Sequence, residues 1–483
     1  MQQQTCPELD VVFYPRSIAV VGASSHMAKS GAKWVIGLQK AGFPGRIYPV
    51  SARGGSLAGL DIHPSLSSID EDVDYVIASV PAQSAMSVVE ECVRKKVKAV
   101  QFFTAGFRET GTVKAAALEE EMLRRASTAG LRIIGPNCIG ACCPKSRIPL
   151  GPSPLGKVGA PGNVSFISQS GGIAAKLVEY GIARHLHYSK GVSIGNSIDL
   201  DAADFLEYFA GDDTTWYIGM YMEGTNNGRR FFDALRTVAA QKPTVVLKGG
   251  RTEAGAATAR SHTGSLASSA PVWSAMLRQS RAIEAMNLEE LTDCLLLLQK
   301  IGATRARGIG IVGGLADGGG GISVSGSDAC ADNGLDIPEL RSTTAAGLRE
   351  LIGEVGSILR NPVDVSPAQF RGLDVLFESI KRVASDPGVE LLIVQEDVDI
   401  MLSYLGDSET DSINDFLSTL PDVCRKPLVM VMPPGSCEAK RLVSVGRLQE
   451  ARIPVFPTMS RAARAISLVS HRPNSFTSTP PLQ

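Results

Sequence analysis

Short apolar runs alternate with amphipathic segments along nearly the whole chain. The first runs are SIAVVGA, GRIYPV, DYVIASVP, AVQFFTAG and LRIIGPN, and helical stretches such as AMSVVEECVRKK and AAALEEEMLRRAS lie between them. Runs that are apolar throughout are typical of strands buried on both faces of a parallel sheet. The pattern therefore predicts an α/β fold in which helices cover both faces of parallel sheets.

This alternation occurs in three cycles. The turn-rich stretch CCPKSRIPLGPSPLGKVGAPGN precedes the second cycle, whose runs are NVSFISQ, SKGVSIG, TWYIGMYM and PTVVLKGG. The third cycle begins at GIGIVGG, after the helical segment LEELTDCLLLLQKIG, and continues to IPVFP. We predict three doubly wound domains, at residues 1–150, 151–302 and 303–483.

Charge and composition exclude several classes of protein. The net charge is −1 over 483 residues, so no global field attracts nucleic acid or an anionic membrane. No apolar run approaches the roughly 20 residues that span a bilayer, and the beginning MQQQTCPELD does not have the pattern of a signal peptide. Nine cysteines without paired metal-binding spacing indicate free thiols in a reducing compartment. We expect a cytoplasmic protein without a metal site, bound to neither nucleic acid nor membrane.

The first predicted strand runs into a turn of small residues that contains Gly22 and Ser24. Backbone N–H groups in such a turn, and at the start of the following helix, can approach a phosphate. The turn lacks the GxGxxG pattern, which disfavours a nicotinamide dinucleotide. Arg53 follows the second strand, where an arginine suits the extra ribose phosphate of coenzyme A. The alternative is that Gly22 serves only the turn and Arg53 is solvated.

A similar strand, turn and helix opens the second domain, in NVSFISQSGGIAAKL. Unsatisfied N–H groups at a helix start, together with serine hydroxyls, form a pocket for an anion. The alternative is an ordinary serine N-cap followed by glycines that allow close packing. The residues predicted to bind phosphate are Ser168, Gln169, Ser170, Gly171 and Gly172.

His262 lies among small residues in the sequence RSHTGSLASS, which predicts a movable loop. No histidine or cysteine lies at a metal-binding spacing from it, and no G-x-S-x-G precedes a helix. An imidazole nitrogen can, however, accept and donate a phosphoryl group. Glu223, at the end of TWYIGMYMEG, can accept a hydrogen bond from the other ring nitrogen and fix the tautomer. We take His262 and Glu223 as the catalytic candidates; a simple loop histidine is the alternative.

A series of ordered motifs resembles the α subunit of the ADP-forming acyl-CoA (acetyl-CoA) synthetases, relatives of succinyl-CoA synthetase. The motifs cover nearly all of the first two domains: VVGAS, GFPGRIYPVSARGG, VPA, TAGFRETG, GPNCIG, ISQSGG, YMEG and GRTEAGA with SHTGSLA. The third domain is similar through a glycine-rich turn and the NPVD motif. It departs in having GGLADGGGG where the family usually has Thr-Asn before the glycines, and the histidine segment ends in ASSA rather than AGSD.

The resemblance implies a function for each domain. The first is expected to be a Rossmann-like CoA-binding domain, the second a flavodoxin-like domain that bears a phosphohistidine, and the third a flavodoxin-like ligase domain. The residues expected to bind CoA are Gly22, Ser24, Arg53, Val80, Pro81, Thr104, Ala105, Gly106 and Asn137.

The resemblance also implies the reaction. An acyl-CoA and phosphate give an acyl phosphate and CoA, His262 takes the phosphoryl group, and ADP receives it; the reverse direction makes acyl-CoA from ATP, a small organic acid and CoA. The chain has no GxxxxGK[ST] motif, so ADP or ATP with Mg²⁺ is expected on an ATP-grasp β subunit in a hetero-oligomer. Two alternatives remain open: a non-catalytic CoA- or acyl-CoA-binding regulatory protein, and a nucleotide-dependent oxidoreductase.

Overall fold

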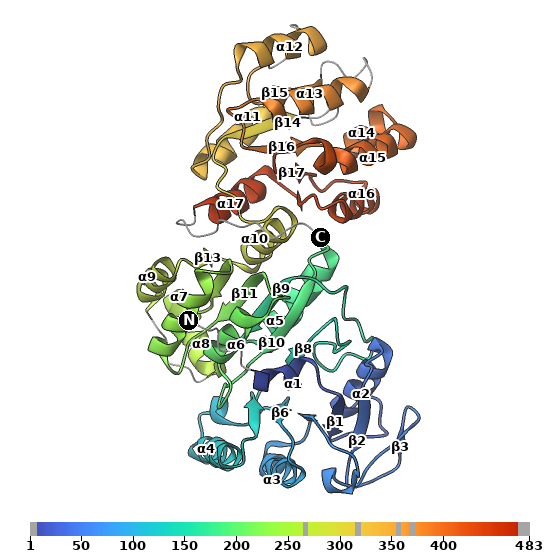
Figure 1. Ribbon diagram of the computed structural model, residues 1–483, viewed down its shortest axis with the longest axis vertical. Helices are drawn as coiled ribbons and strands as arrows, with labels where there is room; N and C mark the ends of the chain where they lie inside the picture. Colours follow the sequence, from blue (N-terminus) through green and yellow to red (C-terminus); the bar gives the residue numbers. More distant parts are fainter. Residues whose placement is uncertain (1–6, 264–268, 314–319, 354–358, 367–372, 472–483) are drawn as a thin grey trace. The chain divides into compact units, whose positions relative to one another are not determined.

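The computed structural model describes residues 7–263, 269–313, 320–353, 359–366 and 373–471. The chain divides into two compact units, Met1–Leu288 and Glu289–Gln483. Besides a two-stranded hairpin, the described residues of the first unit form two larger sheets and those of the second unit form one, so each predicted cycle of strands and helices builds one larger sheet (Figure 1). No described helix is both long enough and apolar enough to cross a bilayer.

The first sheet has five parallel strands in the order β2-β1-β5-β6-β7. The side chains of β5 and β6 are all buried, as expected where helices cover both faces. A small hairpin, β3-β4, follows β2. The strands are β1 (Ser17–Val21), β2 (Arg46–Val50), β3 (Ser56–Leu57), β4 (Leu60–Asp61), β5 (Tyr75–Ala78), β6 (Ala99–Phe102) and β7 (Arg132–Ile134).

The helices around this sheet follow the predicted amphipathic segments. Thr112 is the N-cap of the helix Val113–Thr128, because its hydroxyl accepts a hydrogen bond from the backbone N–H of Ala115 at 3.3 Å. The helices are α1 (Asp10–Phe13), α2 (Ser30–Ala41), α3 (Ala85–Lys95) and α4 (Val113–Thr128), with short 3₁₀ helices η1 (Pro7–Leu9), η2 (Leu66–Ser68), η3 (Ala82–Ser84) and η4 (Arg108–Thr110).

The second sheet has six strands in the order β13-β12-β11-β9-β10-β8, and only β8 runs antiparallel to its neighbour. The strands are β8 (Gly140–Cys142), β9 (Val164–Ser168), β10 (Tyr188–Ser193), β11 (Tyr217–Met222), β12 (Thr244–Lys248) and β13 (Ile283–Ala285). The helices are α5 (Gly171–Ala183), α6 (Ala202–Gly211), α7 (Gly228–Ala239), α8 (Glu253–Thr263) and α9 (Ala270–Ser280).

The third sheet lies in the second unit and has five parallel strands in the order β15-β14-β16-β17-β18. The strands are β14 (Ile309–Gly313), β15 (Val363–Asp364), β16 (Leu391–Gln395), β17 (Leu428–Val431) and β18 (Val455–Phe456). The helices are α10 (Leu288–Ile301), α11 (Gly320–Asp332), α12 (Ser342–Ile352), α13 (Leu373–Ser385), α14 (Val398–Tyr404), α15 (Asp407–Val423), α16 (Glu438–Glu450) and α17 (Met459–Ser470).

These three sheets confirm the predicted α/β class. Every predicted apolar run is a strand, and in each sheet the first long strand lies between the second and the third, which is the doubly wound order. Strand β8 was not predicted, because the three residues Gly-Ala-Cys carry no periodic pattern. It joins the second sheet although it precedes residue 150, and α10 precedes residue 302. The boundaries at 150 and 302 stay a prediction.

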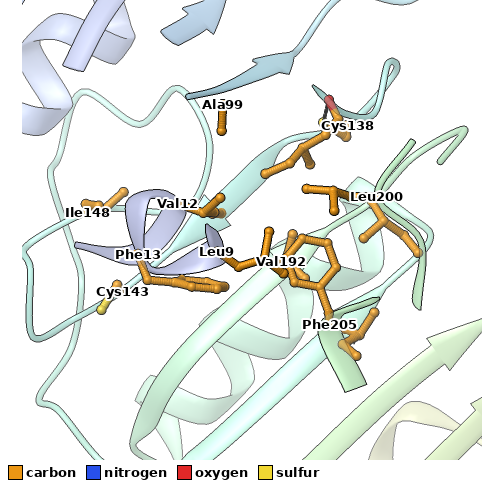
Figure 2. Close-up of a cluster of buried hydrophobic side chains, with 14 of the residues drawn as sticks. Leu9, Val12, Phe13, Ala99, Cys138, Cys143, Ile148, Val192, Leu200 and Phe205 are labelled. Atoms are coloured by element: carbon orange, nitrogen blue, oxygen red, sulfur yellow. Dashed lines mark hydrogen bonds between the residues drawn. The ribbon is translucent and has the colours of Figure 1, made fainter. Parts of the chain in front are cut away.

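The two sheets of the first unit share one hydrophobic core. Leu9 of η1 and Val12 and Phe13 of α1 lie in the same cluster as Val192 of β10 and Phe205 of α6 (Figure 2). All five side chains are at most 2% exposed. The N-terminal segment therefore packs against the second sheet and joins the first two domains through apolar contact.

A partly buried ion pair adds a polar link between these two sheets. The Arg132 guanidinium of β7 donates to both carboxylate oxygens of Asp199, at 3.0 and 3.1 Å. The same carboxylate accepts a hydrogen bond from the backbone N–H of Ile133 at 2.8 Å. Two-point pairing of this kind fixes direction as well as distance, so it holds the end of the first sheet in register with the segment before α6.

The aromatic core predicts a large loss of stability on truncation of Phe13. Its ring is fully buried and stacks on Tyr208 with ring centroids 5.4 Å apart. Phe13→Ala should lower the free energy of unfolding of the first unit by about 3–5 kcal/mol, because a cavity replaces the ring. Urea denaturation followed by circular dichroism measures this. The control Val113→Ala, at a side chain that is 87% exposed, should change it by less than about 0.5 kcal/mol. Equal effects would contradict the shared core.

Candidate functional site

The strand order of the first unit changes direction at two places. In the first sheet β1 lies between β2 and β5, and in the second sheet β9 lies between β10 and β11. In open parallel sheets, ligands bind outside the carboxyl ends of the strands at such a switch point. The predicted CoA residues follow strands of the first sheet, and the predicted phosphate residues follow β9.

The turn after β1 requires glycine, because its backbone packs closely against neighbouring backbone atoms. Gly22 has φ +92°, and a Cβ at this position would lie 2.2 Å from the carbonyl oxygen of Ser79. A Cβ on Gly31, in the first turn of α2, would lie 2.1 Å from the carbonyl oxygen of Gly22. The turn is thus in backbone contact with β5's end and with α2. The N-cap of α2, Lys29, makes no side-chain cap hydrogen bond, which leaves N–H groups available to an anion.

Hydrogen bonds tie together the turns that follow β5, β6 and β7. The Thr104 hydroxyl donates to the carbonyl oxygen of Val80, and the Asn137 N–H donates to the carbonyl oxygen of Thr104 at 2.8 Å. Gly106 has φ +106°, and its N–H donates to the Glu109 carboxylate at 2.6 Å. These residues therefore form one connected edge of the sheet.

The other predicted CoA residues lie at the same edge. Ser24 follows β1, and its hydroxyl accepts a hydrogen bond from the His26 N–H at 3.1 Å. Pro81, Ala105 and Arg53 are exposed, and Arg53 makes no hydrogen bond or ion pair within the described residues. An uncommitted guanidinium at this edge suits a phosphate ligand.

The turn after β9 combines a helix N-terminus with serine hydroxyls. Ser170 is the N-cap of α5: its hydroxyl accepts a hydrogen bond from the Ile173 N–H at 3.4 Å. The Ser168 hydroxyl donates to the carbonyl oxygen of Ser170 at 2.7 Å. The N-cap interpretation and the anion interpretation are compatible, because this cap satisfies one N–H group. The N–H groups of Gly171 and Gly172 have no acceptor among the described residues.

Gln169 joins this turn to the end of β11. Its side-chain oxygen accepts hydrogen bonds from the N–H groups of Glu223 at 2.6 Å and Gly224 at 3.0 Å, while its own backbone N–H donates to the carbonyl oxygen of Tyr221 at 3.0 Å. The predicted phosphate turn and the predicted carboxylate therefore lie on adjacent strand ends in a fixed relation.

The Glu223 carboxylate is 6% exposed and only half satisfied. Its Oε1 accepts a hydrogen bond from the Tyr221 hydroxyl at 3.0 Å, and its buried Oε2 has no partner among the described residues. The Lys248 ammonium donates to the backbone carbonyl oxygen of Glu223 at 2.8 Å and to that of Gly249. Burial lowers the pKa of Lys248. A buried carboxylate oxygen without a donor is costly, so the geometry favours a further donor at Oε2.

His262 lies in the last turn of α8, so the prediction of a loop at this residue is wrong. The segment EAGAATARSHT contains four alanines and begins with an acidic residue, both of which favour a helix. The His262 side chain and residues 264–268 are outside the described part of the chain.

The helix that carries His262 lies against η4, which directly follows the turn of Thr104, Ala105 and Gly106. Within η4, Glu109 accepts a hydrogen bond from the Asn196 side chain at 2.6 Å. This hydrogen bond between the two sheets was not predicted from the sequence. The only signal for it was the acidic residue in TAGFRETG, and nothing in the sequence identified Asn196 as its partner.

The described residues contain no group of three or more His, Cys, Asp or Glu side chains arranged to hold a metal ion. Their ligand-binding features are instead backbone N–H groups, hydroxyls and the exposed Arg53. These groups are suited to phosphate and other anions.

Family models match both domains of the first unit. Residues 16–144 match the CoA binding domain, and residues 161–298 match the succinyl-CoA ligase like flavodoxin domain. These matches confirm the domain types that the motifs implied.

Curated relatives match almost the whole chain. The chain is 35% identical over 95% of its length to acetate–CoA ligase [ADP-forming] I of Archaeoglobus fulgidus, of which it spans 63%. It is 32% identical over 95% of its length to acetate–CoA ligase [ADP-forming] I subunit alpha of Pyrococcus furiosus, of which it spans 96%.

A solved structure supports the same relationship. The acetyl-coenzyme A synthetase 1 of Ca. Korarchaeum cryptofilum, in complex with phosphate and ADP, has a TM-score of 0.82 and 31% identity. The match covers 95% of this chain and 96% of that one. The resemblance found in the motifs is thus confirmed, and the chain belongs to the family of the ADP-forming acetate–CoA ligase α subunits.

Proposed function

We propose that this chain is the α subunit of an NDP-forming acyl-CoA synthetase. The observation that carries the proposal is the pairing, through Gln169, of a helix start that keeps two N–H groups without an acceptor among the described residues with a buried carboxylate that lacks one donor. A phosphoryl group and the histidine that carries it need these two features: N–H donors for the anion and an acceptor for the second ring nitrogen.

The first step takes place between the carboxyl edge of the first sheet, where CoA is expected, and that of the second sheet, where phosphate is expected. A phosphate oxygen attacks the carbonyl carbon of the acyl-CoA thioester, the C–S bond breaks, and CoA leaves as a thiolate with the acyl phosphate as the other product. The N–H groups of Gly171 and Gly172 and the hydroxyl of Ser170 hold the phosphate, because the start of α5 favours negative charge, and the Ser168 hydroxyl fixes the turn through its hydrogen bond to Ser170.

His262 performs the second step. Its imidazole attacks the phosphorus of the acyl phosphate, the P–O bond to the acyl group breaks, and the carboxylic acid leaves as its anion. Oε2 of Glu223 accepts a hydrogen bond from the other ring nitrogen and stabilises the charge that develops on the ring. ADP then takes the phosphoryl group, and each step is reversible.

CoA occupies the carboxyl edge of the first sheet in this proposal. The pyrophosphate lies at the Gly22 turn and the start of α2, where N–H groups of the helix start favour an anion. Thr104, Ala105 and Gly106 place the thiol end towards η4, against which α8 lies. The thioester is thereby directed towards the helix that carries His262.

A catalytic role explains the site better than the regulatory alternative. A protein that only bound CoA would need the carboxyl edge of the first sheet alone. It would gain nothing from a buried carboxylate on the second sheet with an oxygen that has no partner among the described residues. The relatives bear the names of ligases, which favours the catalytic function. A hydride-transferring function is disfavoured by the Gly22 turn, which lacks GxGxxG.

The nucleotide is expected on a second subunit. The Pyrococcus furiosus relatives are named as subunits alpha, which supports a hetero-oligomer with an ATP-grasp β subunit that holds ADP or ATP with Mg²⁺. We propose the cytosol as the compartment, since the eight described cysteines are all free thiols. The acyl substrate is a small organic acid.

The CoA assignment predicts an effect of Arg53 that depends on the 3′-phosphate. Arg53→Ala should weaken CoA binding about tenfold and leave dephospho-CoA almost unchanged, because only CoA carries the phosphate that the guanidinium meets. Isothermal titration with both ligands measures the difference. Arg16→Ala is a matched control, because Arg16 is exposed but paired with Asp74. The assignment of Arg53 is rejected if both ligands lose the same affinity.

The phosphohistidine predicts a selective loss of activity. His262→Ala should reduce labelling of the chain from acyl-CoA and radioactive phosphate by at least about a thousandfold, because the phosphoryl acceptor is absent. Glu223→Gln should slow this labelling by about ten- to a hundredfold. CoA binding, followed by the shift in melting temperature, should stay close to that of the wild type. Retained labelling in His262→Ala would remove the basis of the proposal.

The proposal of an ATP-grasp β subunit predicts that activity depends on a second chain. ATP, acetate and CoA should give no thioester with this chain alone and should give it once an ATP-grasp β subunit is added. Formation of the CoA thioester, followed by its absorbance, measures this, with the His262→Ala chain plus β subunit as the control. Ligation by the isolated chain would contradict the proposed division of labour.

A further inference from the structure

Among the described residues, Tyr221 makes the one side-chain hydrogen bond to the Glu223 carboxylate. Its hydroxyl donates to Oε1 at 3.0 Å, and the two residues leave β11 on the same side because they are two positions apart. Oε2 stays buried and without a partner among the described residues. The hydroxyl therefore occupies one carboxylate oxygen and leaves the other for a different donor.

The tyrosine ring has little freedom to move. A Cβ on Gly249 would lie 2.4 Å from the Tyr221 hydroxyl and 2.9 Å from the ring carbon that bears it, so the ring is packed against the backbone at the end of β12. The carbonyl oxygen of Tyr221 also accepts the N–H of Gln169 at 3.0 Å. Both the backbone and the side chain of Tyr221 are thus fixed with respect to the phosphate turn.

The hydroxyl is also held in its donor form. Burial, together with the negative charge of Glu223, raises the pKa of Tyr221 well above its ordinary value. The phenol therefore stays protonated across the whole physiological range and donates permanently to Oε1. A hydrogen bond to one oxygen restricts the rotation of the carboxylate and leaves the other oxygen free to accept.

We propose that Tyr221 is a positioning residue for the phosphoryl-transfer reaction: its hydroxyl occupies Oε1 of Glu223 and orients the carboxylate, which leaves Oε2 as the acceptor for the second ring nitrogen of His262. This inference rests on the proposed function of Glu223 and His262. Without the hydroxyl, the carboxylate can turn about its last bond, and the fraction of time in which Oε2 meets the imidazole falls. The loss should appear in the rate of phosphoryl transfer and not in ligand affinity.

The test uses Tyr221→Phe in the full chain, with acetyl-CoA and radioactive phosphate as probes. Acid-labile, base-stable labelling in a single turnover should be about tenfold slower than in the wild type, which corresponds to one hydrogen bond to a charged group. The acetyl-CoA concentration for half-maximal rate and the melting temperature should be unchanged. Tyr217→Phe is the matched control: it makes the same change on the same strand, at a hydroxyl with no hydrogen bond among the described residues, and should label at the wild-type rate.

A double-mutant cycle separates positioning from a general structural effect. If Tyr221 acts through Glu223, Tyr221→Phe should have almost no further effect in a Glu223→Ala chain. A tenfold loss in both backgrounds would overturn the inference, and so would a wild-type rate in the single variant. In either case slow labelling of Glu223→Ala and absent labelling of His262→Ala would leave the proposed function standing. Wild-type labelling of these two variants would instead reject the function itself.

Discussion

The hydrogen bonds from Glu223 and Gly224 to the Gln169 side chain are the constraint on which the candidate site depends. They link the ends of two adjacent strands, β9 and β11, exactly where the second sheet reverses its order. Without them the helix start at Gly171 and the buried carboxylate would be independent features. With them, the helix start and the buried carboxylate are held at a fixed separation, as the proposed phosphoryl transfer requires.

A second set of contacts relates this site to the first sheet. Glu109 accepts hydrogen bonds from Gly106 in the expected CoA turn and from Asn196 after β10, and the N–H of Ile194, two residues earlier, donates to the carbonyl oxygen of Ser168. The segment after β10 is thus hydrogen-bonded to both strand edges. Since the two sheets also share a core, their strand edges are held in a defined geometry, as the proposed reaction between a thioester on the first domain and a phosphate on the second requires.

The sequence predicted the strands well because all of them except the short edge pieces are apolar runs bounded by turn residues. The sequence also predicted the turns at Gly22 and Ser168, because the formation of a turn depends on local backbone geometry. It did not predict the roles of Tyr221, Lys248 or Asn196, whose partners lie on neighbouring strands and follow only from sheet register. The loop expected at His262 was wrong because alanines in the preceding segment extend α8 over that residue.

The central claim is that the phosphoryl group becomes covalently bound to one particular nitrogen-bearing side chain. The most direct measurement is to incubate the full chain with acetyl-CoA and phosphate, digest it under alkaline conditions and locate the added phosphoryl group by mass spectrometry. The account predicts a single modified peptide, with the phosphoryl group on His262. A phosphoryl group on any other residue, or none on a chain that still cleaves the thioester, would contradict it.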